Sequence, residues 1–203
     1  AYGMTEASHQ MASNPLPPNE RRPGSVGTGT GVKIGIMNDL GSLLHSGDRG
    51  EVVVQGDNVI KGYEDNPDAN ATSFSNGWFR TGDEGIIAED GYLTLVGRIK
   101  ELINRSGEKI SPVEIDEVLL THSAVSEAVA FAVPHKVHGE EPSAAVVLNA
   151  EVTSRELIEH CRNHLADFKT PRTIHIVNEI PRTPTGKVQR RIVASTIAGQ
   201  SPK

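Results

Sequence analysis

The sequence predicts two consecutive folded units of different class, a β-rich unit followed by a compact α+β unit. Residues 1 to about 97 contain short apolar runs separated by glycine and aspartate turns, a pattern typical of strands. After Lys100, helix-start signals alternate with strand-like runs. A unit of about one hundred residues is large enough to fold as a small domain. We therefore expect a boundary at 99/100, with domains at 1–99 and 100–203.

In the first unit, four runs rich in β-branched and apolar residues predict strands at 32–36, 51–54, 86–88 and 92–96. Asp90 and Gly91 form a hairpin signal between the last two. The proline-rich stretch 15–18 is predicted to be a surface connection. The glycine-rich run 27–31 imitates a phosphate-binding loop, but it leads into a strand and lacks the Walker lysine, so we expect a turn. This half reads as all-β and incomplete.

Two helix-start signals stand in the second unit. Ser111, Pro112 and Glu114 suit the N-cap, N1 and N3 positions, and Thr153 with Glu156 forms a second capping signal. The apolar residues that follow fall on one face of each helix: Ile115, Val118 and Leu119, then Leu157, Ile158, Cys161 and Leu165. Strands are predicted at 128–133, 144–148 and 173–177.

The bulk composition is that of a soluble globular protein. The 203 residues are 36% hydrophobic and 23% charged. A net charge of −6 gives no reason to expect nucleic acid or an anionic membrane as a partner, so a polyanionic ligand would need local positive groups. The single cysteine, Cys161, excludes an intrachain disulfide and fits a reducing compartment. No apolar run reaches the roughly 20 residues that span a bilayer.

The segment 181–190 (PRTPTGKVQR) carries the strongest chemical signal. Lys187 follows a Pro/Thr/Gly turn, which can deliver an ammonium group to a phosphate or a developing oxyanion without burying it. Its spacing is not that of a Walker loop. Taken alone, the segment fits an ordinary surface loop equally well.

Three further blocks precede it in the order 2–6 (YGMTE), 80–83 (RTGD) and 97–101 (GRIKE). Together the four motifs resemble the adenylate-forming, AMP-binding superfamily of acyl-CoA synthetases, carrier-protein adenylation domains and firefly luciferase. The resemblance covers essentially the whole chain. It implies the C-terminal part of the two-domain adenylate-forming enzyme fold, α/β and α+β. Residues 1–99 would be the β-rich end of the large AMP-binding domain and 100–203 the small mobile domain.

The resemblance also implies roles for the first block. Glu6 would hold Mg²⁺, Thr5 would contact the α-phosphate of ATP, and the backbone of Tyr2, Gly3 and Met4 would lie against adenine. A hard cation suits a carboxylate ligand. The alternative is that this block is only a turn at the end of a strand.

The other blocks would complete a nucleotide site. By resemblance, Asp83 accepts hydrogen bonds from both ribose hydroxyls and Arg98 adds a second contact. Lys187 would stabilise negative charge as the acid joins the α-phosphate. Lys100 would be the hinge about which the small domain swings between two half-reactions. The alternative for Asp83 is that it caps a turn.

After that swing, Ser106, Gly107 and Glu108 would line the route of the pantetheine arm of CoA, with Gly107 leaving room for it. Three weaker candidates could contact the nucleotide end of CoA, although a solvated surface role fits them as well: Lys109, His138 and Arg162.

The runs 4–11, 97–105 and 107–112 look like oxalyl-CoA synthetases of plants and fungi. This resemblance implies a small dianionic acid, oxalate, as substrate. Ser8 and His9 would lie near the acyl group, where a donor or positive charge on His9 suits a dianion. The alternative is a histidine packed in the pocket wall.

His160, Cys161 and His164 stand at helical spacing and could suggest a metal site. Because Cys161 falls on the apolar face and no fourth ligand is near, we expect none.

The expected activity is that of an AMP-forming acid–CoA ligase using ATP, Mg²⁺ and CoA, acting on a small carboxylate such as oxalate. Three alternatives stay open: a medium- or long-chain acyl-CoA synthetase, an adenylation module that loads a carrier protein, and a non-enzymatic nucleotide-binding relative. The chain opens within a motif and lacks an initiating Met, so we expect it to be the C-terminal part of a longer polypeptide. The family's phosphate loop and most of its acyl pocket are missing, which predicts that residues 1–203 alone do not catalyse adenylation.

Peroxisomal relatives end in a Ser-Lys-Leu type signal, whereas this chain ends in Ser201, Pro202 and Lys203. That ending predicts a cytoplasmic enzyme, or a peroxisomal one if the native terminus differs.

Overall fold

The computed structural model describes residues 1–184 and 186–197. The chain divides into two compact units: the first covers Ala1–Ile99 and the second begins at Lys100. None of the helices in the described ranges is long and apolar enough to cross a membrane. The chain's last residues, 201–203, on which the expected location depends, lie outside the described residues.

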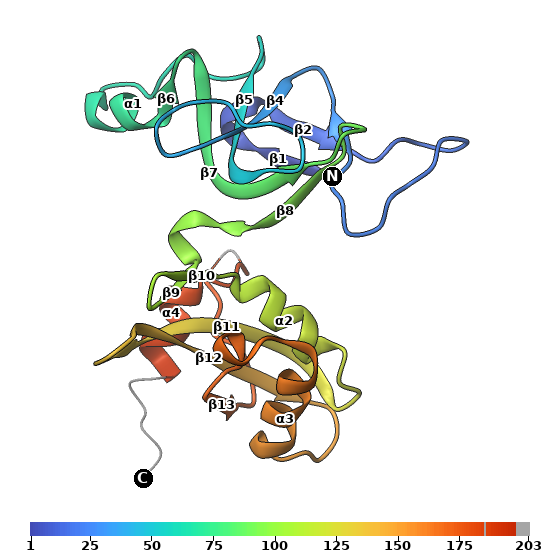
Figure 1. Cartoon of the computed structure of the whole chain (residues 1–203), viewed down its shortest axis with the longest axis vertical. Coiled ribbons are helices and arrows are strands. Elements are labelled where there is room, and N and C mark those ends of the chain that lie inside the picture. Colours follow the sequence, from blue (N-terminus) through green and yellow to red (C-terminus); the bar gives the residue numbers. More distant parts are fainter. Residues whose placement is uncertain (185, 198–203) are drawn as a thin grey trace. The chain divides into compact units, whose positions relative to one another are not determined.

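The first unit contains two antiparallel sheets (Figure 1). The smaller sheet has the order β1 (Tyr2–Met4), β2 (His9–Ser13) and β3 (Thr28–Gly29), with a 3₁₀ turn, η1 (Thr5–Ala7), joining the first two strands. The larger sheet has the order β4 (Lys33–Met37), β5 (Arg49–Gln55), β7 (Trp78–Ile87) and β6 (Phe74–Ser75), and β8 (Leu93–Arg98) pairs with β7. Residues of both sheets share one core, including Met11, Ala12, Val52, Val54 and Phe79.

The strands expected at 32–36, 51–54 and 92–96 are confirmed with ends that differ by one or two residues, whereas 86–88 covers only the end of β7, which begins at Trp78. The expectation of an all-β unit is wrong, because a helix, α1, spans Pro67–Ser73. Asn66 caps it by accepting a hydrogen bond from the Ala69 amide, and Pro67 occupies the first turn. No residue of α1 is buried, so it lacks the apolar periodicity that signals a helix. The run 27–31 is not only a turn, since Thr28–Gly29 form β3.

The second unit is built on one mixed sheet. Its strands follow the order β10 (Glu108–Ile110), β9 (Ile103–Arg105), β12 (Gly139–Leu148) and β11 (Val125–His135), and β13 (Thr173–Ile176) pairs in parallel with β12. The helices are α2 (Pro112–Leu120), α3 (Ser154–His164) and α4 (Arg190–Ile197), with 3₁₀ turns η2 (Ile99–Glu101) and η3 (Asp167–Lys169).

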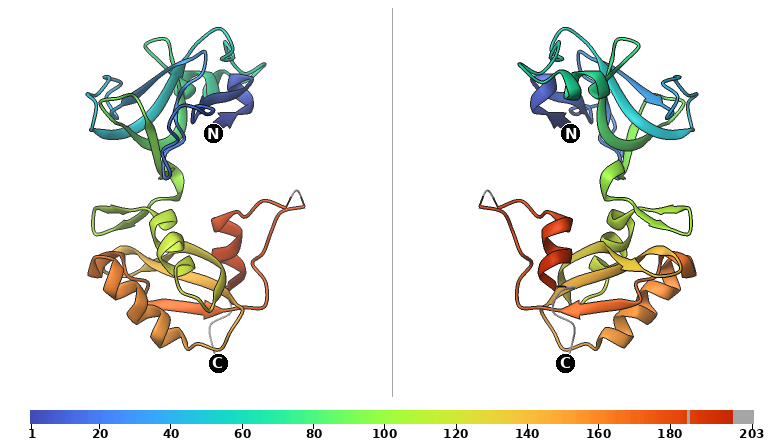
Figure 2. Two further views of the ribbon diagram at one scale, coloured as in Figure 1. Left: turned by 90° about the vertical axis from the view of Figure 1, so that its right-hand side faces the viewer. Right: turned by 90° about the vertical axis from the view of Figure 1, so that its left-hand side faces the viewer.

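Helices cover both faces of this sheet, with α4 on the face opposite α2 and α3 (Figure 2). Strand side chains alternate between two cores, as the pleat of a strand requires. Ala130 and Val146 belong to the core that α2 and α3 cover. Val129, Phe131 and Ala145 belong to the core that Val193 and Ile197 of α4 complete. The buried alternation on both faces explains the near-continuous apolar runs of β11 and β12.

The helix starts agree only in part with the sequence. Thr153 and Glu156 form a full capping box, as expected. Ser111 occupies the N-cap position of α2 but makes no side-chain cap hydrogen bond, which corrects the expected cap. Glu114 instead accepts from Lys169 Nζ at 2.7 and 2.8 Å, so its carboxylate is taken by a tertiary partner. Leu165 lies one residue past the end of α3.

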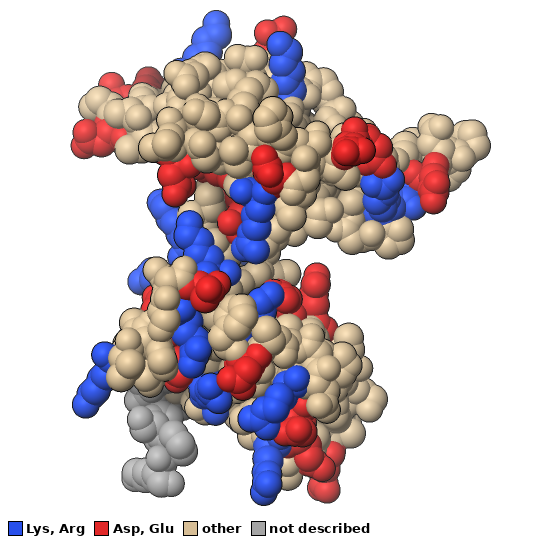
Figure 3. Space-filling view, in the orientation of Figure 1, with Lys and Arg blue, Asp and Glu red and all other residues tan. Residues whose placement is uncertain are grey.

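Acidic and basic side chains are intermixed on the face of the second unit that Figure 3 shows. Among the ion pairs of this unit, Arg162–Glu159 and Arg182–Glu127 are about half-exposed. Exposed pairs of this kind contribute little to stability because water and salt screen them. The stability of the unit therefore depends mainly on its two cores.

Neighbouring leucines of α2 test that conclusion. Leu119 is fully buried and Leu120 is 48% exposed. Leu119→Ala should lower the free energy of unfolding by about 2–5 kcal/mol, whereas Leu120→Ala should change it by less than about 1 kcal/mol. Urea unfolding of the two variants measures both values, and equal losses would contradict the assigned packing.

Cys161 predicts a pH dependence of stability. Burial raises the pKa of its thiol from 9.0 to about 11. The unfolded thiol ionises first, so the stabilisation from this group is complete below pH 9 and is lost as the pH rises toward 11. The stability advantage of the wild-type chain over Cys161→Ala should therefore shrink by about 2 kcal/mol between about pH 8 and pH 11. A difference that stays constant across this range would refute the buried-thiol explanation.

Candidate functional site

A bulge in β7 takes residues 81–83 out of register with β5, while Asp83 remains paired with Arg98 of β8. Glu51 pairs with Glu84 and Val53 with Arg80, so Val52 alone faces three residues of β7. The Thr81 hydroxyl donates to the Val52 carbonyl oxygen at 2.7 Å, and the Gly82 amide donates to Glu51 Oε1 at 2.9 Å. Gly82 has a φ of 75°, a conformation that favours glycine. Bulges of this kind re-aim side chains, and here the redirected side chain is that of Asp83.

Asp83 is a buried carboxylate with two donors. Tyr2 donates its hydroxyl to Asp83 Oδ2 at 2.6 Å, and Arg98 Nε lies 3.2 Å from Oδ1. Burial and the hydrogen bond to Asp83 raise the pKa of Tyr2, so its hydroxyl remains a donor at neutral pH. Three motifs that lie far apart in the sequence thus meet at one carboxylate.

The two oxygens of Asp83 retain the capacity to bind a ligand. An ionised carboxylate offers about four lone-pair positions, and Tyr2 and Arg98 use one on each oxygen. Two neighbouring hydroxyl groups of a ligand could donate to the remaining positions. The arrangement can therefore recognise a diol, with Arg98, whose side chain is 68% exposed, beside it.

Glu6 lies in η1 and is half-buried. Its backbone oxygen accepts from the Ile60 amide at 2.8 Å, and Tyr63 donates its hydroxyl to Oε1 at 3.2 Å. Burial, followed by the charge of Glu6, raises the pKa of Tyr63, which keeps this donor protonated. A single carboxylate held in this way fits Mg²⁺, which usually binds one or two protein carboxylates and keeps water and phosphate oxygens as its other ligands.

The turn after Glu6 holds His9 in an uncommon backbone conformation. Ser8 and His9 have φ values of 49° and 85°, in the region that favours glycine. A Cβ atom on Gly3 would lie 1.8 Å from the His9 carbonyl oxygen, so only glycine fits opposite this turn. Ser8 Oγ donates to the Asn58 carbonyl oxygen at 3.1 Å. Strained residues of this kind often lie at functional sites, and the His9 side chain is exposed.

Sequence analysis missed the residues that support these turns. Asn58 donates its side-chain amide to the Ala7 carbonyl oxygen at 2.7 Å, and Tyr63 holds Glu6. Neither residue belongs to a motif with a recognisable mechanism. Glu51 carried a usable signal, because a buried glutamate at the start of an apolar strand needs partners, which Arg80 and Gly82 supply.

In the second unit, Lys187 is exposed on a short closed loop. Thr183 donates its amide to the Lys187 carbonyl oxygen at 2.9 Å, and Lys187 donates its amide to Thr183 Oγ1 at 3.1 Å. Arg182 and Val188 form an isolated β-bridge across the loop, and Gly186 has a φ of 78°. The described residues of the loop thus leave the Lys187 side chain exposed to solvent. Thr185, the first residue of the TGK signal, lies outside the described residues.

The turn between β9 and β10 contains the residues expected to line the CoA route. Ser106 and Gly107 have positive φ values, and a Cβ atom on Gly107 would meet nothing within 4 Å. Ser106 Oγ lies 2.8 Å from His138 Nδ1, which fixes the turn to the β11–β12 hairpin. Of the other residues expected to meet CoA, Glu108 and Lys109 are exposed and Arg162 pairs with Glu159. Lys100, the expected hinge, is exposed.

His160, Cys161 and His164 do not converge on one point. Cys161 is buried in the core, His160 Nε2 lies 3.0 Å from the Val118 carbonyl oxygen, and His164 Nδ1 lies 2.8 Å from that of His160. Because a carbonyl oxygen only accepts, each of these ring nitrogens donates and is not available as a ligand.

A different group, His135, His138 and Glu141, has ligand atoms within 4.8 Å of one another. His135 Nδ1 accepts backbone amides at 3.1 and 3.2 Å, and Glu141 lies 3.5 Å from Arg105 and 4.0 Å from Arg172. The carboxylate is thus paired with protein cations, and the group is better described as an ion-pair cluster than as a metal centre.

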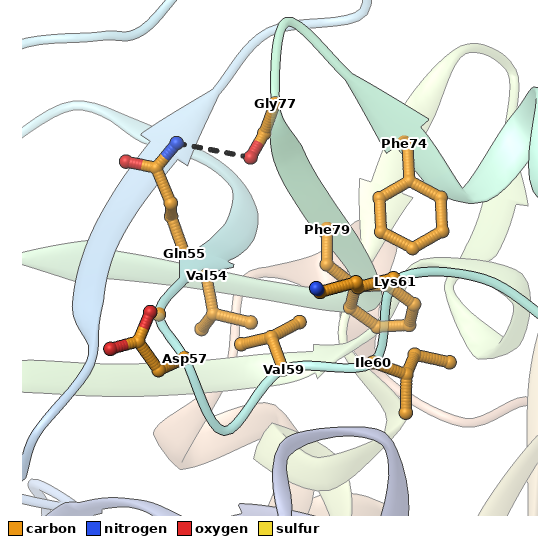
Figure 4. A pocket seen from close by; sticks show the side chains of 10 residues that line it. Val54, Gln55, Asp57, Val59, Ile60, Lys61, Phe74, Gly77 and Phe79 are labelled. Carbon is orange, nitrogen blue, oxygen red and sulfur yellow. Dashed lines mark hydrogen bonds between the residues drawn. The ribbon is translucent and has the colours of Figure 1, made fainter.

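A pocket of about 540 Å³ opens in the first unit between the segment 54–61 and residues Phe74, Gly77 and Phe79 (Figure 4). Gln55 donates its amide to the Gly77 carbonyl oxygen across one end. None of the residues expected to bind nucleotide, metal, CoA or acid lines it. The 54–61 segment also contacts the Glu6 turn: the Ile60 amide donates to the Glu6 carbonyl oxygen, and Asn58 bonds to Ala7 and Ser8.

Comparisons with known proteins agree with this geometry. The model of AMP-binding enzymes matches residues 1–64, and that of the AMP-binding enzyme C-terminal domain matches residues 114–187. The chain is 49% identical to an oxalate–CoA ligase of Saccharomyces cerevisiae and 52% identical to one of Arabidopsis thaliana, over 99% and 96% of its length. It spans 38% of each of these relatives.

Among solved structures, it matches O-succinylbenzoate coenzyme A synthetase of Bacillus subtilis in complex with ATP and magnesium ion, with a TM-score of 0.86 and 35% identity. That match covers 95% of this chain and 40% of the other. The expected fold, the C-terminal part of the adenylate-forming enzyme fold, is thereby confirmed. By its two family matches and its fold, the chain belongs to the AMP-binding, adenylate-forming enzyme family.

Proposed function

We propose that this chain is the nucleotide-facing end and the small mobile domain of an AMP-forming acid–CoA ligase. The observation that carries the proposal is the meeting of Tyr2, Asp83 and Arg98 at one buried carboxylate. A carboxylate in this setting, with free lone pairs on both oxygens, suits the vicinal hydroxyls of a ribose. The similarity to oxalate–CoA ligases supports the same activity.

In the first half-reaction, a carboxylate oxygen of the acid attacks the α-phosphorus of ATP, and the bond to the β-phosphate oxygen breaks to release pyrophosphate. Asp83 orients the ribose, and Thr5 contacts the α-phosphate. The ammonium of Lys187 stabilises the negative charge that builds up on the reacting oxygens. Glu6, positioned by Tyr63, is the residue that would hold Mg²⁺, and the cation supplies further positive charge at the phosphates.

In the second half-reaction, the CoA sulfur attacks the acyl carbonyl carbon, the thiol proton leaves, and the bond to AMP breaks. We assign Lys100 as the hinge that lets the small domain present a different face for this step. The turn of Ser106 and Gly107 then lies along the pantetheine route. The open space at Gly107 supports this role, because a side chain there would narrow the passage.

Oxalate is the acid that the site residues favour. His9 is exposed on a rigid turn close in sequence to Glu6, and a donor or positive charge there suits a second carboxylate. Ser8 fixes the turn through its bond to Asn58. Monocarboxylic acids such as fatty acids lack that second carboxylate and would gain nothing from His9.

The function can be tested in a chimera in which this full chain replaces the matching C-terminal portion of the Arabidopsis oxalate–CoA ligase. With ATP and Mg²⁺, the chimera should release pyrophosphate with oxalate and form oxalyl-CoA when CoA is added. Lys187→Ala should slow adenylation by about 10²–10³-fold, while the exposed-lysine control Lys33→Ala should not.

If the chimera forms CoA thioesters of longer acids but no oxalyl-CoA, the assignment of oxalate as substrate is wrong. If it forms an acyl-adenylate but no CoA thioester, the chain belongs to a module that loads a carrier protein. A chimera with no adenylate at all would refute the proposal. The isolated 203-residue chain should show no turnover, because the resemblance places the phosphate loop and most of the acyl pocket outside it.

The Tyr2 hydroxyl provides a separate test. Tyr2→Phe leaves one oxygen of the buried Asp83 without its donor and should cost about 1–3 kcal/mol of unfolding free energy. In the chimera it should also raise KM for ATP, since Asp83 would lose its orientation. Tyr92→Phe is the matched control, because the Tyr92 hydroxyl donates to the Glu20 carbonyl oxygen at an exposed site. This substitution should change the free energy of unfolding by less than about 0.5 kcal/mol. Equal losses of unfolding free energy in Tyr2→Phe and Tyr92→Phe would contradict the buried hydrogen bond between Tyr2 and Asp83.

A further inference from the structure

We propose that Arg190 is a positioning residue for Lys187. The contacts of its side chain with Asp116, Ala130 and Glu101 around the open edge of β11, which we call the clamp, anchor the loop of Lys187 to the rest of the second unit. Of this loop, the structure describes residues 182–184 and 186–189. The inference rests on the proposed function for what Lys187 does, but the anchoring itself is a property of the chain. None of the motif roles discussed above includes Arg190, Asp116 or Glu101 in this capacity.

The guanidinium of Arg190 is fully engaged. Its NH1 donates to the Ala130 carbonyl oxygen at 2.8 Å, its NH2 to Asp116 Oδ2 at 2.6 Å, and its Nε to Glu101 Oε2 at 3.2 Å. The side chains of Arg190 and Asp116 are only 16% and 13% exposed. All three nitrogens of one buried cation therefore have fixed partners on three different elements.

The position of these partners explains why the clamp is needed. β11 is the edge strand of the sheet, so polar backbone groups on its outer side have no neighbouring strand. Asp116 Oδ1 accepts from the Ala130 amide at 2.5 Å, and Arg190 satisfies the carbonyl of the same residue. Asp116 belongs to α2 and Arg190 to α4, which cover opposite faces. The ion pair thus joins the two helical layers around the edge of the sheet.

Charge balance makes each member depend on the other. Burial raises the pKa of the Asp116 carboxyl, and the bond from Arg190 opposes that rise. A buried carboxylate without its cation is unfavourable, as is a buried guanidinium without its anion. We therefore expect the Arg190–Asp116 ion pair to stay formed, whereas the neighbouring exposed ion pairs form and break.

The clamp lies at one end of the Lys187 loop. Arg190 is the first residue of α4 and follows Lys187 by three positions. At the other end of the loop, Arg182 pairs with Glu127 and donates to the Gly186 carbonyl oxygen, but these side chains are 47% and 44% exposed. Since screened pairs restrain little, the buried Arg190 is the stronger ionic anchor of the loop, and it acts together with the packing of Val188 against the α4 core.

The first test measures the loop directly in the full chain by amide hydrogen exchange. Arg190→Gln should speed exchange at the Gly186 and Lys187 amides at least tenfold and leave those of α3 unchanged. Arg191→Gln, at an exposed position on the same turn, is the control and should change neither. Unchanged exchange at Gly186 and Lys187 in Arg190→Gln would overturn the proposal.

If Arg190→Gln fails to fold, Glu101→Gln answers the same question. It removes the negative charge of one partner of the guanidinium, leaves an amide oxygen that can still accept from Nε, and keeps the bonds to Asp116 and Ala130. It should speed exchange at the same two amides by a smaller factor. An absence of change there would overturn the proposal as well.

The second test separates positioning from a general loss of structure, using the chimera. Arg190→Gln should lower kcat for adenylation at least tenfold with KM for ATP within twofold. Thioester formation from a preformed acyl-adenylate, which does not use Lys187, should stay within twofold of wild type, and Arg190→Lys should recover part of the adenylation rate. Equal slowing of both half-reactions would show a structural role only and overturn the proposal. If the wild-type chimera makes no adenylate, the proposed function fails, and the exchange data still decide the anchoring.

Discussion

A buried carboxylate must be paired, and both units are organised around that constraint. In the first unit the carboxylate is Asp83, which draws together Tyr2 from β1 and Arg98 from β8. In the second it is Asp116, which draws together α2, the edge of β11 and Arg190 of α4. Each pairing joins segments more than seventy residues apart in the sequence. Hydrophobic burial stabilises the layers, and these polar contacts specify which segments meet.

The same two clusters connect the scaffold to the proposed chemistry. Asp83 keeps lone pairs for a ligand because Tyr2 and Arg98 each approach a different oxygen of its carboxylate. Arg190 is largely buried, whereas Lys187, three residues earlier, is exposed. An ammonium group that acts on a phosphate must reach it without being permanently desolvated, and its position must also be restricted. A buried anchor beside an exposed ammonium group meets both requirements.

The sequence predicted much of this arrangement where local chemistry decides it. The capping box at Thr153 and Glu156 and the strand runs of β5 and β11 follow from residue types at fixed spacing, and the structure contains them. The short helix α1 was missed because no residue of it is buried, so no apolar period marks it. Ser111 marked the start of α2 correctly, but whether Glu114 caps the helix depends on Lys169, 55 residues away.

Side-chain contacts between residues far apart in the sequence were, in general, what could not be predicted. Motif order indicated that Tyr2, Asp83 and Arg98 serve one ligand, but no spacing rule says that a tyrosine hydroxyl binds the aspartate. Asn58, Tyr63 and Asp116 carry no local signal, since their importance lies in what they touch. Assignment of the two units as pieces of a large and a small mobile domain, and of the site residues to their roles, remains a proposal that depends on ligand binding.

The most direct test of the account is a titration of the isotopically labelled full chain with AMP, followed by amide and side-chain NMR shifts. The account predicts that shifts concentrate at the Thr81–Asp83 bulge, at Arg98 and at Tyr2, and that Asp83→Asn abolishes them while leaving the fold intact. Shifts that gather instead around the 540 Å³ pocket at residues 54–61, or that survive Asp83→Asn, would contradict the assignment of the nucleotide site.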